Sequence, residues 1–487
     1  MAKVLLLFPP QNEKVLAPTN FEPLPLEILA ATVPRHSVKI IDLRFDSLSY
    51  LKQVLLSFSP DIVGITVNNT IDVNAALKVL RFVKEILPGA KNIVGGNHPT
   101  LAPYDFYSKD TDAIFIGWAE KTFPLYINSI DHNELPDSVS GVIYLNDGIP
   151  VNSPKPAHDI EADDVPLPDR QLTAAYTGYY KDELGRPTTL VNTSRGCPYR
   201  CVFCACWKAA RGKYFVRNAK DVFEEVKSLP TNTHRVLFAD DNTFSDIKRA
   251  KALACLLQDW GVKKEYSGYC RADTIVNNPE LFRMWKKIGL ANLTIGIEAT
   301  NDRSLTELNK SISSDINQEA IRILNDFKIS FSTYFLIDPG FEEKDFKAIG
   351  GYIEHHNIIR PRFVITTPLP GTSLYQKRKA EIMMDYDYFD FMHWVTPTRL
   401  KEKDFFNYFT KLYYDAFSLR RYLKLLLTGL LSKLITNKSP GTQIHHLPLI
   451  EVVLSRVMAH PLKRKLYKQY FKSRSKSQNY RIPVSSD

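Results

Sequence analysis

The sequence predicts an α/β protein made of two series of alternating strands and helices, followed by a helical C-terminal segment. Short apolar runs of strand length alternate with amphipathic stretches of helix length over residues 1–130 and again over 188–367. This alternation is typical of βαβ units, whose strands form a parallel sheet. A chain of 487 residues is long enough for two to four domains, and its apolar content of 44% is sufficient for large cores.

We predict four segments along the chain. They are a Rossmann-like parallel-sheet domain over residues 1–135, a linker over 136–187, a partial (βα)6 barrel over 188–375, and a basic, mostly helical segment over 376–487. The linker is predicted from residues 161–170, which are rich in proline and acid, the composition of a connection that runs over the surface.

The first series contains five predicted strands and three predicted helices. The strands are 3–8, 38–43, 61–67, 92–94 and 113–117, and the helices are 24–33, 48–58 and 72–86. Residues 1–8 are interpreted as a strand and not as a signal peptide, because the apolar run is five residues long and ends at Pro9 and Pro10. We therefore expect a cytoplasmic protein with reduced thiols.

The second series contains six predicted strands, which is the number expected for a partial barrel. They are 189–193, 235–239, 265–269, 293–298, 330–337 and 362–367, with helical patterns such as 219–229, 245–260 and 278–288 between them. In such barrels functional residues gather at the carboxyl ends of the strands. Asp240, Arg271 and Glu298 stand at three of these ends. Taken singly, each is as well explained by helix capping or surface pairing.

A cysteine-rich loop follows the first strand of the second series. Within residues 194–206, Cys197, Cys201 and Cys204 have the spacing C-x3-C-x2-C. Three thiolates in eight residues can hold one metal centre, and a four-iron cubane would keep one iron open to a small molecule. A structural zinc site is the alternative, with Cys206 as fourth ligand, but such sites use two separated pairs. A disulfide framework does not fit six cysteines in so long a chain.

This spacing, with the aromatic Phe203 just before the last cysteine, resembles the radical S-adenosylmethionine (SAM) superfamily. The resemblance implies a 4Fe-4S cluster held by Cys197, Cys201 and Cys204. It also implies that SAM lies against the cluster. SAM would be contacted there by residues of the cysteine loop and of the strands' carboxyl ends, which together form the rim of the barrel. The residues so implied are Phe203, Asp240, Arg271 and Glu298.

The first series has the layout of a nucleotide-binding domain, but the G-x-G-x-x-G fingerprint is absent. It resembles instead the cobalamin-binding domain that precedes many radical SAM domains. The pocket positions that this resemblance implies are Thr66, Gly95, Gly96, His98, Gly117 and Glu120. Arg44 stands where the family's cobalt-ligating histidine would be, and Ser47 replaces a glycine, so no axial ligand is expected from residues 42–47.

The C-terminal segment carries the positive charge of the chain. Residues 401–487 hold 17 Lys and Arg against 5 Asp and Glu, which leaves a balance of about −2 for residues 1–400. An aromatic-rich helix is predicted over 403–419, followed by a short leucine block with basic flanks over 420–433. Two hypotheses stay open for this block: a helical lid on the barrel, or peripheral contact with a membrane interface. No nucleic-acid motif is present.

Together these resemblances imply a cobalamin-dependent radical SAM methyltransferase. Such an enzyme abstracts hydrogen from an unactivated carbon with a 5′-deoxyadenosyl radical and then methylates that carbon. The basic, aromatic C-terminal segment, which is suited to a membrane interface, makes a lipid-like or polycyclic substrate the first hypothesis. Residues 390–400 also resemble, over a short stretch, the tail region of hopanoid C-methylases. An oxidative ring-forming enzyme and a non-catalytic cobalamin or cluster sensor are the alternatives. A flavodoxin- or ferredoxin-like reductant is the implied protein partner.

Overall fold

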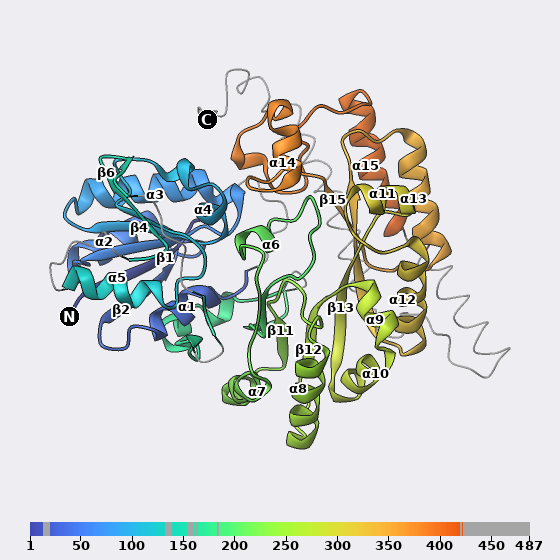
Figure 1. Ribbon diagram of the computed structural model, residues 1–487, viewed down its shortest axis with the longest axis horizontal. Helices are drawn as coiled ribbons and strands as arrows, with labels where there is room; N and C mark the ends of the chain where they lie inside the picture. The colour runs from blue at the N-terminus through green and yellow to red at the C-terminus, as the bar shows by residue number, and fades with distance from the viewer. Residues whose placement is uncertain are drawn as a thin grey trace.

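Two α/β units lie beside each other in the computed structural model (Figure 1). The structure describes residues 1–12, 20–131, 139–152, 159–161, 164–182, 185–418 and 421. The blue N-terminal unit and the green-to-gold second unit each contain a parallel sheet covered by helices. The predicted fold class is confirmed.

The N-terminal unit is organised around a seven-stranded sheet with the strand order β2-β1-β3-β4-β5-β6-β7. Its five parallel strands are β1 (Lys3–Phe8), β2 (Ser37–Asp42), β3 (Ile62–Thr66), β4 (Lys91–Gly95) and β5 (Ala113–Phe115). The strand order reverses direction between β1 and β3. In open α/β sheets, ligands bind outside the carboxyl ends of the strands at such a reversal.

Helices cover both faces of this sheet, so its strands are apolar on both sides. Leu5 and Leu7 of β1 pack in one core, which α2 (Leu48–Phe58) and α3 (Val73–Ile86) cover. Val4 and Leu6 pack in the other core, which α1 (Leu24–Ala31) and α5 (Thr122–Asp131) cover. The carboxyl ends of the strands and the short helix α4 (Asn97–Leu101) lie at the edge of these two cores.

The segment expected to be a linker contains two further strands of the N-terminal sheet. The strands β6 (Val142–Asn146) and β7 (Ile149–Pro150) form a hairpin, and β6 pairs antiparallel with β5. Asp147 and Gly148 at the turn have φ values of 49° and 81°. Two positive φ values in an Asp-Gly pair are typical of a two-residue hairpin turn, so the sequence held a signal for these strands.

The second unit is an open six-stranded barrel with the order β15-β14-β13-β12-β11-β8, all parallel. Its strands are β8 (Thr189–Val191), β11 (Arg235–Phe238), β12 (Glu265–Cys270), β13 (Leu290–Glu298), β14 (Ser330–Ile337) and β15 (Pro361–Ile365). The main helices are α7 (Ala219–Ser228), α8 (Ile247–Trp260), α10 (Pro279–Ile288), α12 (Ser314–Asp326) and α13 (Glu343–His355). Among the described strands, β8 and β15 do not pair, so the barrel is partial, as predicted.

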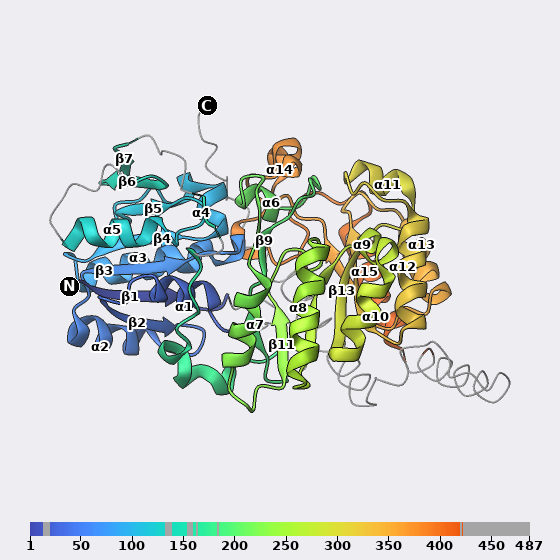
Figure 2. The ribbon, with the colours of Figure 1, turned by 60° about the horizontal axis from the view of Figure 1, so that its bottom comes forward.

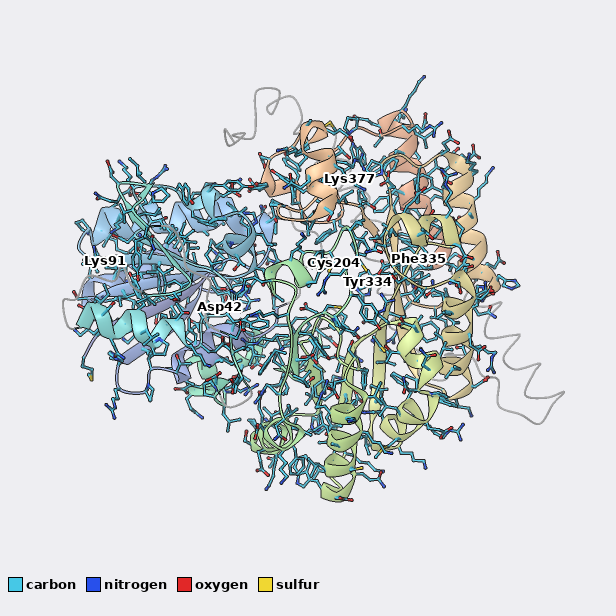
Figure 3. The ribbon with its side chains drawn as sticks, in the orientation of Figure 1. Asp42, Lys91, Cys204, Tyr334, Phe335 and Lys377 are labelled. Atoms are coloured by element: carbon cyan, nitrogen blue, oxygen red, sulfur yellow. The ribbon has the colours of Figure 1, made fainter. Side chains whose placement is uncertain are left out.

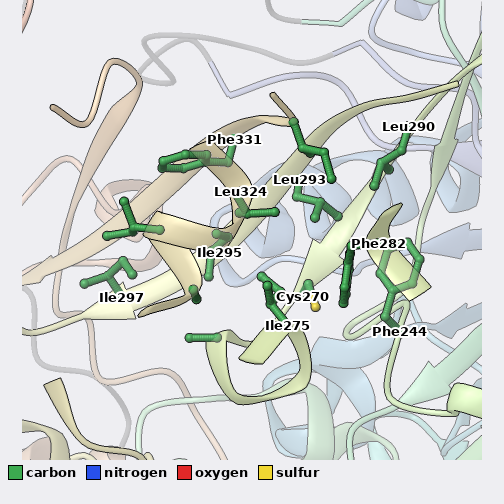
Figure 4. Packing of buried hydrophobic residues seen from close by; sticks show 14 of the residues in the cluster. Phe244, Cys270, Ile275, Phe282, Leu290, Leu293, Ile295, Ile297, Leu324 and Phe331 are labelled. Carbon is green, nitrogen blue, oxygen red and sulfur yellow. The ribbon is translucent and has the colours of Figure 1, made fainter. Parts of the chain in front are cut away.

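The core of the second unit lies between its sheet and its helices. Leu293, Ile295 and Ile297 of β13 point toward the helices and pack with Phe282 of α10 and Leu324 of α12 (Figure 4). Because side chains alternate along a strand, the residues between them face the interior of the barrel. The sheet therefore has one face in the core and one face at the candidate site.

The C-terminal segment contacts both units. Helix α15 (Glu402–Ala416) packs beside α13 and confirms the predicted aromatic helix (Figure 2). Residues 382–395 pack against the N-terminal unit, where the Asp387 carboxylate accepts hydrogen bonds from Asn12 and Asn74, each at 3.1 Å. The basic block at 420–433 lies outside the described residues, apart from Arg421. Among the described helices, none is long and apolar enough to cross a bilayer.

A buried ionic cluster lies where the two units and the connecting segment meet. Arg170 of the 3-10 helix η5 (Arg170–Tyr179) lies 3.6 Å from Glu22 and 2.9 Å from Glu225 of α7. Arg217 also binds Glu225, at 2.5 Å. Glu27 of α1 is fully buried. Burial raises the pKa of Glu22 to about 7 and that of Glu27 to about 8.

Glu27 should make the folded chain less stable as the pH rises. Folded Glu27 keeps its proton up to about pH 8, whereas the unfolded side chain loses it near pH 4.5. The unfolded state therefore binds fewer protons between these values, and the free energy of unfolding falls as pH rises from about 5 to 8. In Glu27→Gln this group no longer titrates, and the Gln carbonyl can still accept the hydrogen bond from the Thr173 hydroxyl.

We expect the melting temperature of the wild type to fall from pH 5 to pH 8, and that of Glu27→Gln to fall less. The difference between the two proteins corresponds to on the order of 3 kcal/mol between pH 5 and pH 8. Glu319→Gln on the exposed face of α12 is the matched control, because the pKa of Glu319 is lowered by Arg322 and no stabilisation at high pH is expected. Parallel pH profiles for the wild type and Glu27→Gln would contradict the prediction.

Candidate functional site

The cysteine loop begins where the first barrel strand ends. After β8, the chain forms β9 (Ser194–Gly196), which pairs antiparallel with β10 (Tyr214–Val216), and the loop between them holds the cysteines. Cys201 is buried, whereas Cys197 and Cys204 are half-buried. The loop lies at the carboxyl ends of the barrel strands, on the side that faces the N-terminal unit (Figures 1 and 3).

Backbone carbonyls within the loop are held by side chains of the loop itself. The indole of Trp207 donates to the Cys201 carbonyl at 3.0 Å, and the Arg200 guanidinium donates to the Gly212 carbonyl at 2.7 Å. The Cys204 amide donates to the Cys201 carbonyl at 3.3 Å. These bonds fold the loop so that its three signature thiols lie close enough to influence one another electrostatically.

Asp240 anchors the start of this loop. One carboxylate oxygen accepts the amides of Thr193 at 2.7 Å and Ser194 at 2.8 Å, and the other accepts the Thr193 hydroxyl at 2.5 Å. Asn192 adds a fourth bond at 3.2 Å. The side chain is 5% exposed, so the structure places this predicted SAM contact beneath the loop, bonded to its first residues.

The neighbouring Asp241 lies next to the thiols. Its side chain is exposed, yet the surrounding protein raises its pKa, as expected for a carboxylate in a concave site. The Gly196 amide and the Cys206 thiol donate hydrogen bonds to it. Asp240 and Asp241 both follow β11, so the sequence does not distinguish them. The structure does, because their side chains point in different directions.

The loop fits an iron–sulfur cluster. Burial raises the pKa of Cys197 and of Cys201, whereas a hydrogen bond from the Cys206 thiol lowers that of Cys204. Across the described residues, no three His, Cys, Asp or Glu side chains are close enough to share one metal ion. A cubane does not require this, because each cysteine would bind a different iron.

Arg271 and Glu298 converge on the same rim as the loop. The Arg271 guanidinium lies 3.6 Å from the ring centre of Tyr199 in the loop and donates to the Lys310 carbonyl at 2.7 Å. The Glu298 carboxylate pairs with the Lys310 ammonium at 2.9 Å. The structure thus brings these two predicted residues together beside Cys201, and it adds Lys310, which the sequence analysis missed. Phe203 is half-buried within the loop.

The interior face of the barrel carries polar and aromatic side chains. The register aligns Tyr269 of β12 with Thr294 of β13, and Gly296 of β13 with Tyr334 of β14. On the neighbouring strand β15, Arg362 pairs with Tyr334, and its guanidinium lies 5.9 Å from the ring centre of Tyr334. These side chains are half-buried, unlike the tightly packed residues that fill a closed barrel. Tyr334 and Cys204 both lie in the centre of the molecule (Figure 3).

In the N-terminal unit, four predicted cobalamin contacts lie at or just after the ends of adjacent strands. Thr66 ends β3, Gly95 ends β4, Gly96 follows it and Gly117 follows β5. Gly96 has a φ of 118°, and a Cβ atom there would meet the Val67 carbonyl oxygen at 2.6 Å. Only glycine therefore fits this turn, and the half-buried glycines Gly95, Gly96 and Gly117 lie together at the carboxyl ends of parallel strands, the edge at which ligands bind in such sheets, so this edge fits cobalamin.

His98 and Glu120, the other two predicted contacts, are engaged with protein groups. His98 is 2% exposed, and its ring nitrogens lie 3.1 Å from the Thr70 hydroxyl and 2.8 Å from the Asp105 carboxylate. Glu120 is buried and forms an ion pair with Arg195 of the cysteine loop. Their predicted role toward cobalamin stays a prediction.

Arg44, at the position of the missing axial histidine, is also engaged. Its guanidinium binds the Asp42 carboxylate at 2.5 Å and the Phe21 carbonyl at 2.6 Å, and it lies 4.0 Å from the ring centre of Phe8. A guanidinium in this position cannot serve as a metal ligand, so the residues support the expectation of no axial ligand from this loop.

The edge of the N-terminal unit contacts the cysteine loop directly. Besides the Glu120–Arg195 pair, the ring of Trp118 lies 6.1 Å from that of Phe215 in β10. Helix α4 also packs near α6 (Cys206–Ala209), which follows the last signature cysteine (Figure 1). The two candidate sites therefore face each other across this contact.

Residues 191–352 match the radical SAM superfamily, and residues 16–127 match the B12 binding domain. The chain therefore contains a radical SAM domain and a B12-binding domain. It is 26% identical over 399 residues to the hopanoid C-3 methylase of Methylococcus capsulatus, covering 80% of this chain and 76% of that one. It is 27% identical to the anaerobic magnesium-protoporphyrin IX monomethyl ester cyclase of Cereibacter sphaeroides, covering 73% and 59%.

Solved structures of two B12-binding radical SAM proteins share this fold. The cobalamin-dependent enzyme OxsB matches with a TM-score of 0.68 at 15% identity, over 97% of this chain and 81% of that one. The methyltransferase TsrM from Kitasatospora setae matches with a TM-score of 0.62 at 17% identity, over 77% and 75%.

The protein is thus a radical SAM enzyme whose cofactors are a 4Fe-4S cluster, SAM and cobalamin. Cys197, Cys201 and Cys204 are the residues that would hold the cluster. Arg271 and Glu298 stay predicted contacts of SAM, and the glycine-rich strand ends of the N-terminal unit stay predicted contacts of cobalamin.

Replacement of Gly196 should prevent cluster assembly. Gly196 has a φ of 75°, and a Cβ atom there would lie 2.3 Å from the Lys213 carbonyl oxygen, so Gly196→Ala would push β9 and β10 apart. We expect Gly196→Ala to hold less than a tenth of the iron found in the wild type after anaerobic reconstitution, as measured by iron analysis and visible absorbance.

Gly212→Ala is the matched control for this test. Gly212 has the same φ of 75°, but a Cβ atom there would meet only the flexible Arg200 guanidinium, at 3.5 Å. The strain of a left-handed alanine is about 1 kcal/mol and is common to both variants, so only the clash differs. Equal iron content in the two variants would show that the clash has no role.

Proposed function

We propose that the enzyme methylates an unactivated carbon of a hydrophobic, lipid-like or polycyclic small molecule. The observation that carries the proposal is the direct contact between the cysteine loop and the edge of the B12-binding unit, through the Arg195–Glu120 pair. When bound, the cluster and SAM supply the radical that removes a hydrogen atom, and cobalamin supplies the methyl group.

The chain's own residues position the reactants. Asp240 and the turn at Gly196 fix the start of the cysteine loop, and Arg271 and Glu298 present fixed charges to the methionine end of SAM. The Arg195–Glu120 pair holds the loop against the B12-binding unit. Such positioning is the protein's main contribution, because a misplacement of about 1 Å can lower the rate about 100-fold.

The interior face of the barrel supports a hydrophobic substrate. Leu237, Leu336 and Val364 lie on this face with Tyr269 and Tyr334, as the alternation along each strand requires. All five are half-buried, so they offer apolar and aromatic surface to a ligand. The similarity to a hopanoid C-3 methylase is consistent with a polycyclic lipid.

Two partners complete the proposal. A flavodoxin- or ferredoxin-like protein would supply the electron that the cluster needs, as the family's chemistry requires. The basic segment beyond residue 420 would give the enzyme peripheral contact with an anionic membrane surface, where a lipid substrate is found. Both follow from the sequence and from the family's chemistry.

The test uses reconstituted, cobalamin-loaded protein with a chemical reductant and SAM that carries a deuterated methyl group. Three probes are compared: a hopanoid and magnesium-protoporphyrin IX monomethyl ester, which appear in the names of the two relatives above, and tryptophan, the substrate bound in the TsrM structure. We expect a deuterated methyl group in the hopanoid product, with 5′-deoxyadenosine formed in a comparable amount, both measured by mass spectrometry.

Cys201→Ala is the control and should form neither product. A porphyrin that loses hydrogen and gains no deuterium would favour the ring-forming alternative and would contradict methyl transfer. Labelled tryptophan without labelled hopanoid would keep methyl transfer and contradict the lipid-like substrate. Formation of 5′-deoxyadenosine alone, unaffected by all three probes, would contradict this choice of substrate class.

A further inference from the structure

A turn after helix α11 (Asp302–Glu307) directs one buried lysine toward the cysteine loop. Lys310 is 5% exposed, and it lies between Asn309 and Ser311, which have φ values of 52° and 57°. Asn309 ends α11 in the left-handed conformation that asparagine often adopts at helix ends, whereas the same conformation at Ser311 costs on the order of 1 kcal/mol. Such strain persists only where the surrounding structure holds it, which suggests a function for the residue between them.

This turn holds the cysteine loop on both sides of Cys201. The Asn309 side chain donates to the Arg200 carbonyl at 2.8 Å, and the Leu308 carbonyl accepts the Val202 amide at 3.1 Å. The residues immediately before and after Cys201 are therefore both bonded to the turn that carries Lys310.

Lys310 also joins the two charged groups of the SAM rim. Its ammonium lies 2.9 Å from the Glu298 carboxylate, and its carbonyl accepts the Arg271 guanidinium at 2.7 Å. Glu298 has a φ of 65°, which turns its side chain back over Gly296. A Cβ atom at Gly296 would lie 2.1 Å from the Glu298 carboxylate oxygen and 2.7 Å from the Lys310 ammonium, so the pair occupies the space above that glycine.

The charges of this pair reach Cys201. The Lys310 ammonium and the Glu298 carboxylate lie close enough to the Cys201 sulfur to interact with it electrostatically, and the turn that carries Lys310 is bonded to the residues on both sides of Cys201. The same charges would act on a cluster bound at Cys201, because the net charge around an iron–sulfur cluster is one of the factors that set its reduction potential.

We propose that Lys310 is a positioning residue that fixes the Glu298 carboxylate at the SAM rim and raises the reduction potential of the cluster by placing a positive charge beside Cys201. A one-electron reduction adds negative charge to the cluster, and a nearby ammonium stabilises that charge. The inference depends on the cluster and SAM, and it does not depend on which substrate is methylated.

The test is a redox titration of the reconstituted, SAM-free cluster, followed by electron paramagnetic resonance. In Lys310→Met the Glu298 charge is left uncompensated, and at a fixed potential we expect the ratio of reduced to oxidised cluster to fall at least tenfold, a shift of about 59 mV. Glu298→Gln removes the opposite charge and should shift the potential in the positive direction. The double variant should lie between the two single variants.

SAM binding gives the second readout. Equilibrium dialysis should show SAM affinity at least tenfold weaker in Lys310→Met, and within threefold of the wild type in Lys310→Arg, because arginine can also hold the Glu298 carboxylate. Lys264→Met is the matched control. Lys264 is also buried in the barrel and donates to the Thr233 carbonyl at 2.6 Å, but it precedes β12 at the opposite end of the strands.

Equal shifts in Lys310→Met and Lys264→Met would overturn the proposal, as would shifts of the same sign in Lys310→Met and Glu298→Gln. If the variants only disturbed packing, Lys310→Met and Glu298→Gln would not shift the reduction potential in opposite directions. If Lys310→Met holds no iron, Glu298→Gln decides: a positive shift supports the proposal, and an unchanged potential overturns it.

Discussion

The carboxylate of Asp240 is the constraint on which the rest of the site depends. It accepts four hydrogen bonds from Asn192, Thr193 and Ser194, the residues that lead from the first barrel strand into the cysteine loop. A buried carboxylate is stable only when such donors surround it, so the carboxylate and the turn fix each other. This turn also sets the position of Gly196. There β9 lies so close to β10 that the Lys213 carbonyl leaves no space for a side chain. The thiols are therefore placed by a chain of contacts that begins one strand away from them.

The relative position of the two units also depends on side chains. The Arg195–Glu120 pair joins the cysteine loop to the B12-binding unit, and residues 382–395 return from the barrel to pack against α3. At the opposite end of the junction, Arg170 joins the buried carboxylates of Glu22 and Glu225. Because these contacts lie on several sides of the interface, the two units cannot rotate about any single contact without breaking the others. The family's chemistry requires two cofactors that are held by different units. These contacts fix the position of one cofactor site relative to the other, which the reaction requires.

The sequence was sufficient for the regular parts of the fold. Strand 330–337 and helix 48–58 agree with the structure to the residue, because each is a periodic apolar pattern with clear ends. The hairpin of β6 and β7 was missed because its strands are short and lie beside an acidic, proline-rich stretch, although Asp147 and Gly148 marked the turn. Loops that lack periodicity give little information about partners. For that reason His98 and Glu120 could be named as site residues, while their bonds to Asp105 and Arg195 could not.

The conformation of Glu298 shows why site geometry was harder to predict than site location. A strand places alternate side chains on one face, so an extended backbone at Glu298 would direct its side chain to the same face as Gly296. The pairing of β13 with β14 shifts between these two residues, and the left-handed backbone of Glu298 folds its carboxylate back over the glycine. In that conformation the carboxylate pairs with Lys310, which lies twelve positions further along the chain between two residues of positive φ. Local periodicity identifies Glu298 as a residue of the rim, but only the contact with Lys310 shows that its charge is compensated before any cofactor binds.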